Sequence, residues 1–131
     1  MTNQSPYLHL RILDCTPTQM RKHLDIYLTL ILTLTLTVAL LWPMDQLILA
    51  QKGNDKFFHF VGFAALAFPL ASTGRFGLLP VLLGTIAFGG AIELIQPSFN
   101  RSADAKDLVA DIFGTALGIG CGLFYRRLRG Y

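Results

Sequence analysis

Several titratable side chains lie at the edges of long apolar stretches in this 131-residue chain, or inside them. His59 follows Asp55 by four positions, which is about one helical turn, and Glu93 lies within an apolar run. A histidine held by a carboxylate could act as a general base, and Glu93 could serve as a shared acid. His59, Glu93 and Asp55 are therefore candidates for catalysis, and no catalytic residue is assigned from these residue types alone.

A larger group of polar residues lies near the same ends of the apolar stretches. It contains five of the eight acidic residues and three bases, which leaves a formal charge of −2 before histidine is counted. Asp107 and Asp111 are four positions apart, so they share one face of a helix. Asp104 and Lys106 are interpreted as a helix cap and a solvated loop residue. The predicted ligand-binding residues are Asp55, Lys56, His59, Glu93, Gln96, Arg101, Asp107 and Asp111.

The same group is a poor match to a transition-metal site. Its single histidine, with no cysteine on the same face, falls short of the usual zinc ligand sets. No metal ligand and no cofactor is assigned for this reason. The many carboxylates leave open an oxygen-rich site for a divalent cation such as Ca²⁺, Mg²⁺ or Mn²⁺.

The medium around these residues follows from composition. The chain is 53% hydrophobic and 15% charged, with a mean hydropathy of +0.50, far from the balance of soluble domains. Four apolar stretches approach the ~20 residues that cross a bilayer as a helix: 26–42, 57–73, 78–95 and 108–125. The sequence predicts an all-α, polytopic membrane protein, a bundle of four transmembrane helices. Residues 1–131 form a single membrane domain that opens with a cytoplasmic tail at 1–24.

Local patterns refine this expectation. The first stretch alternates threonine and leucine, but a lone strand cannot satisfy its backbone in lipid, so a helix is predicted. Its threonines can return their hydroxyls to the carbonyl one turn back. Glycines at every fourth position in the last stretch allow backbones to approach closely, within the chain or between copies. The sequence leaves open a homo-oligomer that packs through these residues, Gly114, Gly118 and Gly122.

The distribution of basic residues predicts the orientation. Seven of the eleven Lys and Arg lie on the face that contains both termini. By the positive-inside rule, both termini are expected to be cytoplasmic and the acid-rich residues are expected to lie at the outer face. No basic surface interleaved with aromatic residues is evident, so a nucleic-acid partner is not expected.

The polar residues, taken in order, resemble the motif of the VanZ-like family. The motif reads Asp-Lys-x-x-His-Phe at 55–60, Glu-x-x-Gln at 93–96, and then Arg101 followed by spaced aspartates, Gly114 and Gly118. One position departs from it, because Asp111 stands one turn after Asp107, where the family typically has Asn. The resemblance implies a multi-pass protein of the bacterial cytoplasmic (inner) membrane and a link to glycopeptide-antibiotic resistance in the cell envelope.

Three functions are compatible with these residues. The first is a binding protein whose outward-facing polar site takes a membrane lipid or a lipid-linked glycan or peptidoglycan precursor. The second is a membrane-embedded hydrolase or transferase acting on a lipid-linked substrate. The third is a structural subunit of a membrane assembly whose ionic residues pair across helices. The first is the expectation carried forward.

Overall fold

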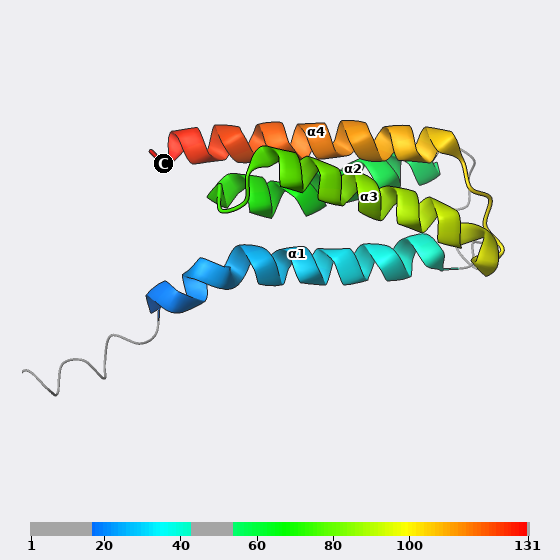
Figure 1. Cartoon of the computed structure of the whole chain (residues 1–131), viewed down its shortest axis with the longest axis horizontal. Coiled ribbons are helices and arrows are strands. Elements are labelled where there is room, and N and C mark those ends of the chain that lie inside the picture. The colour runs from blue at the N-terminus through cyan, green and yellow to red at the C-terminus, as the bar shows by residue number, and fades with distance from the viewer. Residues whose placement is uncertain (1–16, 43–53, 131) are drawn as a thin grey trace, which may run out of the picture.

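The computed structural model describes residues 17–42 and 54–130 as a bundle of long helices (Figure 1). In chain order these are α1 (Pro17–Leu41), α2 (Asn54–Thr73), α3 (Leu78–Ile95), the short 3-10 helix η3 (Gln96–Phe99) and α4 (Ala105–Leu128). The described residues contain no strand. Each of the four α-helices is long and apolar enough to cross a membrane. The predicted all-α polytopic membrane fold is confirmed.

The helix bounds differ from those predicted, most of all for α1, which begins at Pro17, inside the predicted tail and nine residues before the predicted span at 26–42. Helix α3 coincides with the stretch 78–95, whereas α2 and α4 each begin three residues before the predicted spans. Those extra turns contain polar residues that can still continue a helix, so the apolar stretch is shorter than the helix. Helix α1 begins at Pro17, where the fixed φ of proline suits a first helical position. The rest of the predicted tail, residues 1–16, lies outside the described residues.

The alternating Thr and Leu residues of α1 form a helix, as predicted. The hydroxyls of Thr29, Thr33 and Thr37 each donate to the carbonyl four residues earlier, at 2.8 Å. These hydroxyls therefore need no partner from another helix.

The closest packing in the bundle joins α2 and α4. A side-chain carbon added at Gly114 or Gly118 would overlap the backbone carbonyl of Phe60 or Ala64, and one added at Gly122 would crowd Ala71. The glycine stripe is therefore filled by α2 of the same chain. These glycines pack within the chain and not between copies, so an oligomer would have to use another face.

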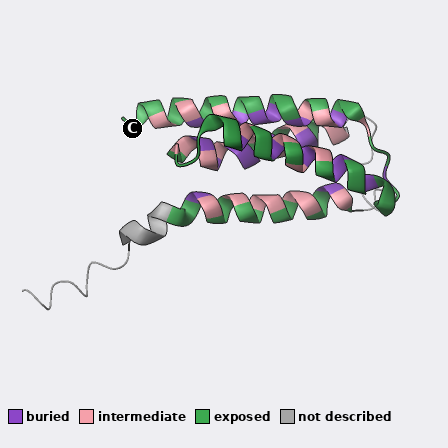
Figure 2. Ribbon diagram, in the orientation of Figure 1, coloured by how far each residue is buried: buried purple, intermediate pink, exposed green. Residues whose placement is uncertain are grey.

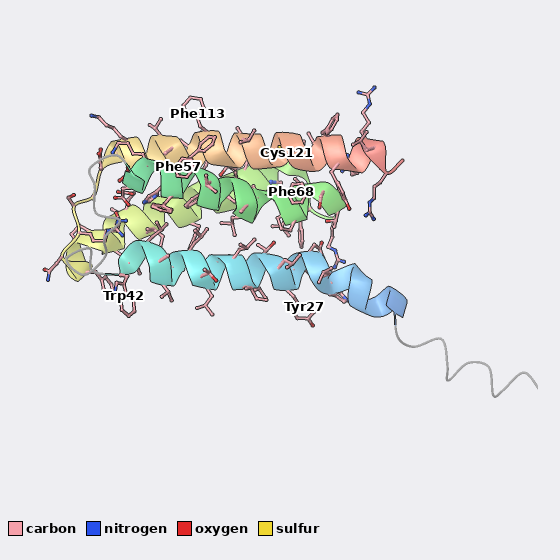
Figure 3. All side chains as sticks on the ribbon, turned by 180° about the vertical axis from the view of Figure 1, so that it is seen from behind. Tyr27, Trp42, Phe57, Phe68, Phe113 and Cys121 are labelled. Carbon is pink, nitrogen blue, oxygen red and sulfur yellow. The ribbon has the colours of Figure 1, made fainter. Side chains whose placement is uncertain are left out.

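Helix α1 is the most peripheral of the four. Only 11% of its membrane-spanning stretch is buried, against 28–33% for the other helices (Figure 2). It contributes Leu40 to a buried apolar cluster with Phe63, Leu66 and Ile92. Tyr27 and Trp42 project away from the other helices (Figure 3), as expected of anchors at a membrane interface.

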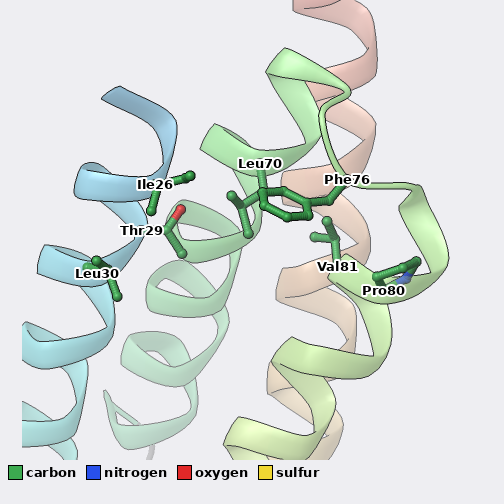
Figure 4. A pocket seen from close by; sticks show the side chains of 7 residues that line it. All are labelled: Ile26, Thr29, Leu30, Leu70, Phe76, Pro80 and Val81. Atoms are coloured by element: carbon green, nitrogen blue, oxygen red, sulfur yellow. The ribbon is translucent and has the colours of Figure 1, made fainter. Parts of the chain in front are cut away.

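An apolar groove of about 240 Å³ lies beside α1 (Figure 4). Side chains of α1, including Ile26 and Leu30, face Leu70 of α2 and Phe76 and Val81 near the start of α3. Its walls are almost wholly apolar. The groove therefore has the character of a lipid-facing surface.

Candidate functional site

The predicted site residues meet at one end of the bundle. Because neighbouring helices run antiparallel, the starts of α2 and α4 lie beside the end of α3 and η3, with the end of α1 at the same end (Figure 1). Hydrogen bonds and ion pairs link residues from all these segments. The three separated parts of the motif therefore lie together in space. We call these residues, with Asp104 added, the polar site.

Arg101, in the connection between η3 and α4, contacts α1 and α2 through its guanidinium group. Asn100 adopts a left-handed conformation, with φ of 56°, and this ends η3 so that the chain turns back toward α2. Arg101 Nη2 then lies 2.6 Å from Asp55 Oδ1, and its Nη1 donates to the carbonyl of Leu40 at 2.7 Å. Gln96 Nε2 donates to the same carbonyl at 3.3 Å. The Arg101 side chain is only 5% exposed, so these bonds replace its hydration.

Lys56 pairs with two acids at the start of α4. Its Nζ lies 2.9 Å from Asp104 Oδ2 and 3.1 Å from Asp107 Oδ1. These ion pairs tie the start of α2 to the start of α4. Since Lys56 and Arg101 already have carboxylate partners, neither is available to neutralise an anionic ligand by itself.

Asp104 has a larger part than the predicted helix cap. Its Oδ1 accepts from the backbone N–H of Lys106 at 2.9 Å, which confirms the cap. Its own backbone N–H donates to Glu93 Oε2 at 2.9 Å, which ties α4 to α3. The N–H of Lys106, and after it the Lys56 ammonium, lower the pKa of Asp104 below its ordinary value. Sequence reasoning had set Asp104 outside the site.

The carboxylate that holds His59 is Asp111, and this corrects the predicted pairing with Asp55. His59 Nδ1 lies 2.8 Å from Asp111 Oδ1, and both side chains are fully buried. Asp55 lies one turn earlier on α2 and turns to Arg101 instead. The His59 ring stacks on Phe63, with 6.3 Å between centroids, so its orientation is fixed from two sides.

Five buried polar atoms of this region have no hydrogen-bond partner within the described part of the chain. They are His59 Nε2, Glu93 Oε1, Gln96 Oε1, Asp111 Oδ2 and Thr115 Oγ1. A buried polar group left unpaired costs about 1–3 kcal/mol, and native proteins retain few of them. Their concentration in one place gives the polar site several atoms that can accept further hydrogen bonds or bind a cation.

Three residues of the polar site could share a cation. One ligand atom each from Asp55, His59 and Asp107 lies within 4.8 Å of the other two. Because His59 Nδ1 faces Asp111, its Nε2 is the nitrogen left to bind a metal. A histidine whose second nitrogen is held by a carboxylate is a common arrangement at metal centres. The geometry is compatible with the divalent cation that the sequence left open.

Besides Asp104, two contributors to the site were not predicted. The Leu40 carbonyl, the acceptor for Arg101, gives no signal in the sequence, because any residue carries one. Thr115 is fully buried one turn after Asp111, so its place on the aspartate face of α4 could have identified it.

No family model, curated protein or solved structure matches this chain. The resemblance to the VanZ-like family thus remains a prediction from the motif.

Proposed function

We propose that this chain is an integral membrane binding protein whose polar site holds a phosphate-bearing envelope component, such as a lipid-linked glycan or peptidoglycan precursor, through a divalent cation. The observation that carries the proposal is the unpartnered Nε2 of the fully buried His59, beside carboxylates of Asp55 and Asp107. A divalent cation could bind this nitrogen as one of its ligands.

Charge favours a cation over a direct anion contact. Five carboxylates face two paired bases, Lys56 and Arg101, so the polar site carries an excess of negative charge. A bare phosphate would add to this excess. A divalent cation would neutralise part of it and could then coordinate phosphate oxygens in its open positions.

Ligand separation is also compatible with a cation. Ligands on opposite sides of Ca²⁺, at ~2.3–2.6 Å from the ion, lie about 4.6–5.2 Å apart, and smaller ions draw them closer. The separation of at most 4.8 Å fits within this range. The carboxylates favour Ca²⁺, Mg²⁺ or Mn²⁺, and the imidazole favours Mn²⁺ among these three.

The test is calorimetric titration of the purified, chelator-treated protein with Mn²⁺, Ca²⁺ and Mg²⁺. We expect His59→Ala and Asp107→Asn to remain folded and to lose cation binding. Lys106→Ala, which changes an exposed residue on the same turn of α4, should bind as the wild type does. Polyprenyl diphosphate in detergent should then bind only in the presence of the cation. A wild-type protein that binds none of these cations would contradict the proposal.

A hydrolase or transferase is the second candidate, because the His59–Asp111 pair has the geometry of an oriented general base. Phosphate release from polyprenyl diphosphate would distinguish the two functions. Turnover that disappears in Asp111→Asn would assign an enzyme, whereas binding without turnover would assign a binding protein. Equal loss of folded protein in His59→Ala and Arg101→Ala would instead favour the structural role.

The orientation and the cellular role belong to the same proposal. A bacterial inner-membrane location with cytoplasmic termini places the polar site at the outer face, where envelope precursors are used. A cysteine at position 100 should then react with an impermeant reagent from outside the cell. Labelling only from the cytoplasmic side would move the site inside. The motif's resemblance to the VanZ-like family adds a second readout, which is teicoplanin resistance with and without the gene.

A further inference from the structure

A cavity lies at the end of the bundle opposite the polar site, where α2 and α4 end. It has a volume of about 780 Å³ and is lined by α1, α2, the turn after α2 and α4. None of the predicted ligand-binding residues, all of which the structure describes, lines it. This cavity, which we call the basic pocket, is therefore separate from the polar site.

Three arginines line the basic pocket, and each is held by a neighbour. Arg75 Nε lies 3.3 Å from Asp25 Oδ2. The Arg129 guanidinium lies over the ring of Tyr125, 4.8 Å from its centroid. Arg126 packs so closely on Gly74 that a side-chain carbon there would overlap its guanidinium. Within the described part of the chain, the lining contains three arginines and one aspartate, a formal charge of +2, so its ligand should be an anion.

Asp25 adds a hydrogen-bond acceptor to this basic surface. It is only 4% exposed, and its Oδ2 accepts from the Thr73 hydroxyl at 2.9 Å in addition to Arg75. Its Oδ1 is buried and has no partner within the described part of the chain. A ligand that fits the pocket should therefore carry a donor beside its negative charge.

The remaining walls favour an amphiphile over a small soluble anion. Leu24 and Leu28 line the pocket and are 53% and 43% exposed. Arginines at the ends of membrane helices lie at the depth of lipid headgroups, where they attract anionic lipids. Apolar walls on the same cavity can contact the first methylenes of an acyl chain.

We propose that the basic pocket binds an anionic glycerophospholipid whose headgroup carries hydroxyl donors. Arg126, in the last turn of α4, and Arg129, which directly follows that helix, contact the phosphate. A headgroup hydroxyl donates to Asp25 Oδ1. The chemistry shared by all candidate ligands is a phosphate ester with a neighbouring donor, which a free glycerol phosphate also provides.

The experiment measures thermal stabilisation of the full chain in detergent by added phosphatidylglycerol. Arg126→Ala should raise the half-saturating lipid concentration roughly fivefold, as expected for the loss of one arginine at a lipid surface. The control is Arg127→Ala, which removes the same charge from the next residue, one that does not line the pocket. It should change the half-saturating concentration little.

Lipid chemistry supplies the other readouts. Wild-type protein should prefer phosphatidylglycerol to phosphatidylmethanol, an anionic lipid without headgroup hydroxyls, and should respond least to phosphatidylcholine. Asp25→Ala should abolish the first preference. If Arg126→Ala does not fold, the order of these lipids on the wild type decides the matter.

Three results would overturn the proposal. Equal weakening by Arg127→Ala would indicate unspecific attraction of anionic lipid to the helix ends. If glycerol phosphate or inorganic phosphate stabilised the protein as effectively as lipid does, the ligand would be a soluble anion. Equal thermal stabilisation by all three lipids would show that the pocket does not recognise the lipid headgroup. Because no lining residue is shared with the polar site, each outcome is independent of cation binding there.

Discussion

The two ends of the bundle carry opposite charge, and they bury it to different extents. In the polar site, the side chains of Asp107, Asp111 and Arg101 are at most 5% exposed and pair across helices. In the basic pocket, only Asp25 is buried to this extent, and its partner Arg75 is 32% exposed. The buried charges of the polar site must be satisfied by protein or a bound ligand, whereas Lys56 and Asp104 at its rim, 43% and 39% exposed, can also be hydrated. Charge in the basic pocket can also be satisfied by water and headgroups.

This difference teaches that the energetic role of a charge depends on what else can reach it. Breaking a buried pair strands the remaining charge, whereas an exposed pair contributes little to stability. The polar site should therefore respond to mutation in its stability and its ligand binding alike. The basic pocket should respond mainly in its ligand binding.

The largest effect is expected for Arg101→Ala in the polar site. The change removes the cation that pairs with Asp55 and leaves the Leu40 carbonyl with Gln96 Nε2 as its donor, so the free energy of unfolding should fall by about 3–5 kcal/mol. Unfolding in mixed micelles measures it, with Lys106→Ala as the exposed control. A loss no larger than in the control would show that the buried charges are solvated in the folded protein.

Two glycines of α4 provide a paired test of the packing between α2 and α4, which extends between the two ends of the bundle. In Gly118→Ala the new carbon meets the backbone of Ala64, so the free energy of unfolding should fall by about 1–3 kcal/mol. Gly120 faces open space, and Gly120→Ala should raise it by up to about 1 kcal/mol through helix propensity. Equal effects at the two positions would contradict the close approach of α2 and α4.

A smaller effect is expected for Asp25→Ala in the basic pocket. The change removes one ion pair and one hydrogen bond, and Arg75 can turn to water. The free energy of unfolding should fall by about 1–2 kcal/mol. The same unfolding measurement applies, with Thr73→Val to separate the hydrogen bond from the ion pair. A loss as large as that of Arg101→Ala would erase the contrast between the two ends.

The smallest effect is the pH dependence that Asp104 contributes. Its folded-state pKa lies below the ordinary value of 3.8, so its stabilisation is present above about pH 3.8 and is lost as the pH falls through the folded-state pKa. Asp104→Asn keeps a good helix cap and removes the charge. The difference in melting temperature between the two proteins should be constant near neutral pH and shrink below about pH 3.8. A difference that persists in acid would indicate a purely structural effect.

Much of the polar site could be predicted because spacing along a helix fixes which residues share a face. Asp107 and Asp111 were placed together on that basis, and short connections brought α2, α3 and α4 side by side. The choice of Asp111 over Asp55 as the partner of His59 could not be made this way. Both are acids near the ends of neighbouring helices, and only the crossing of α2 and α4 decides which one reaches the imidazole.

The sequence by itself determined the medium, the helical fold and the antiparallel order of the spans, because apolar length and backbone hydrogen bonding leave few alternatives in lipid. Tertiary structure alone decided the partners of each charge and the use of the glycine stripe within the chain. It also decided the position of the basic pocket, where Asp25 and Arg75 meet across 50 positions of sequence. Helix periodicity is local, whereas side-chain pairing depends on how helices rotate and approach, which close packing of the whole bundle sets.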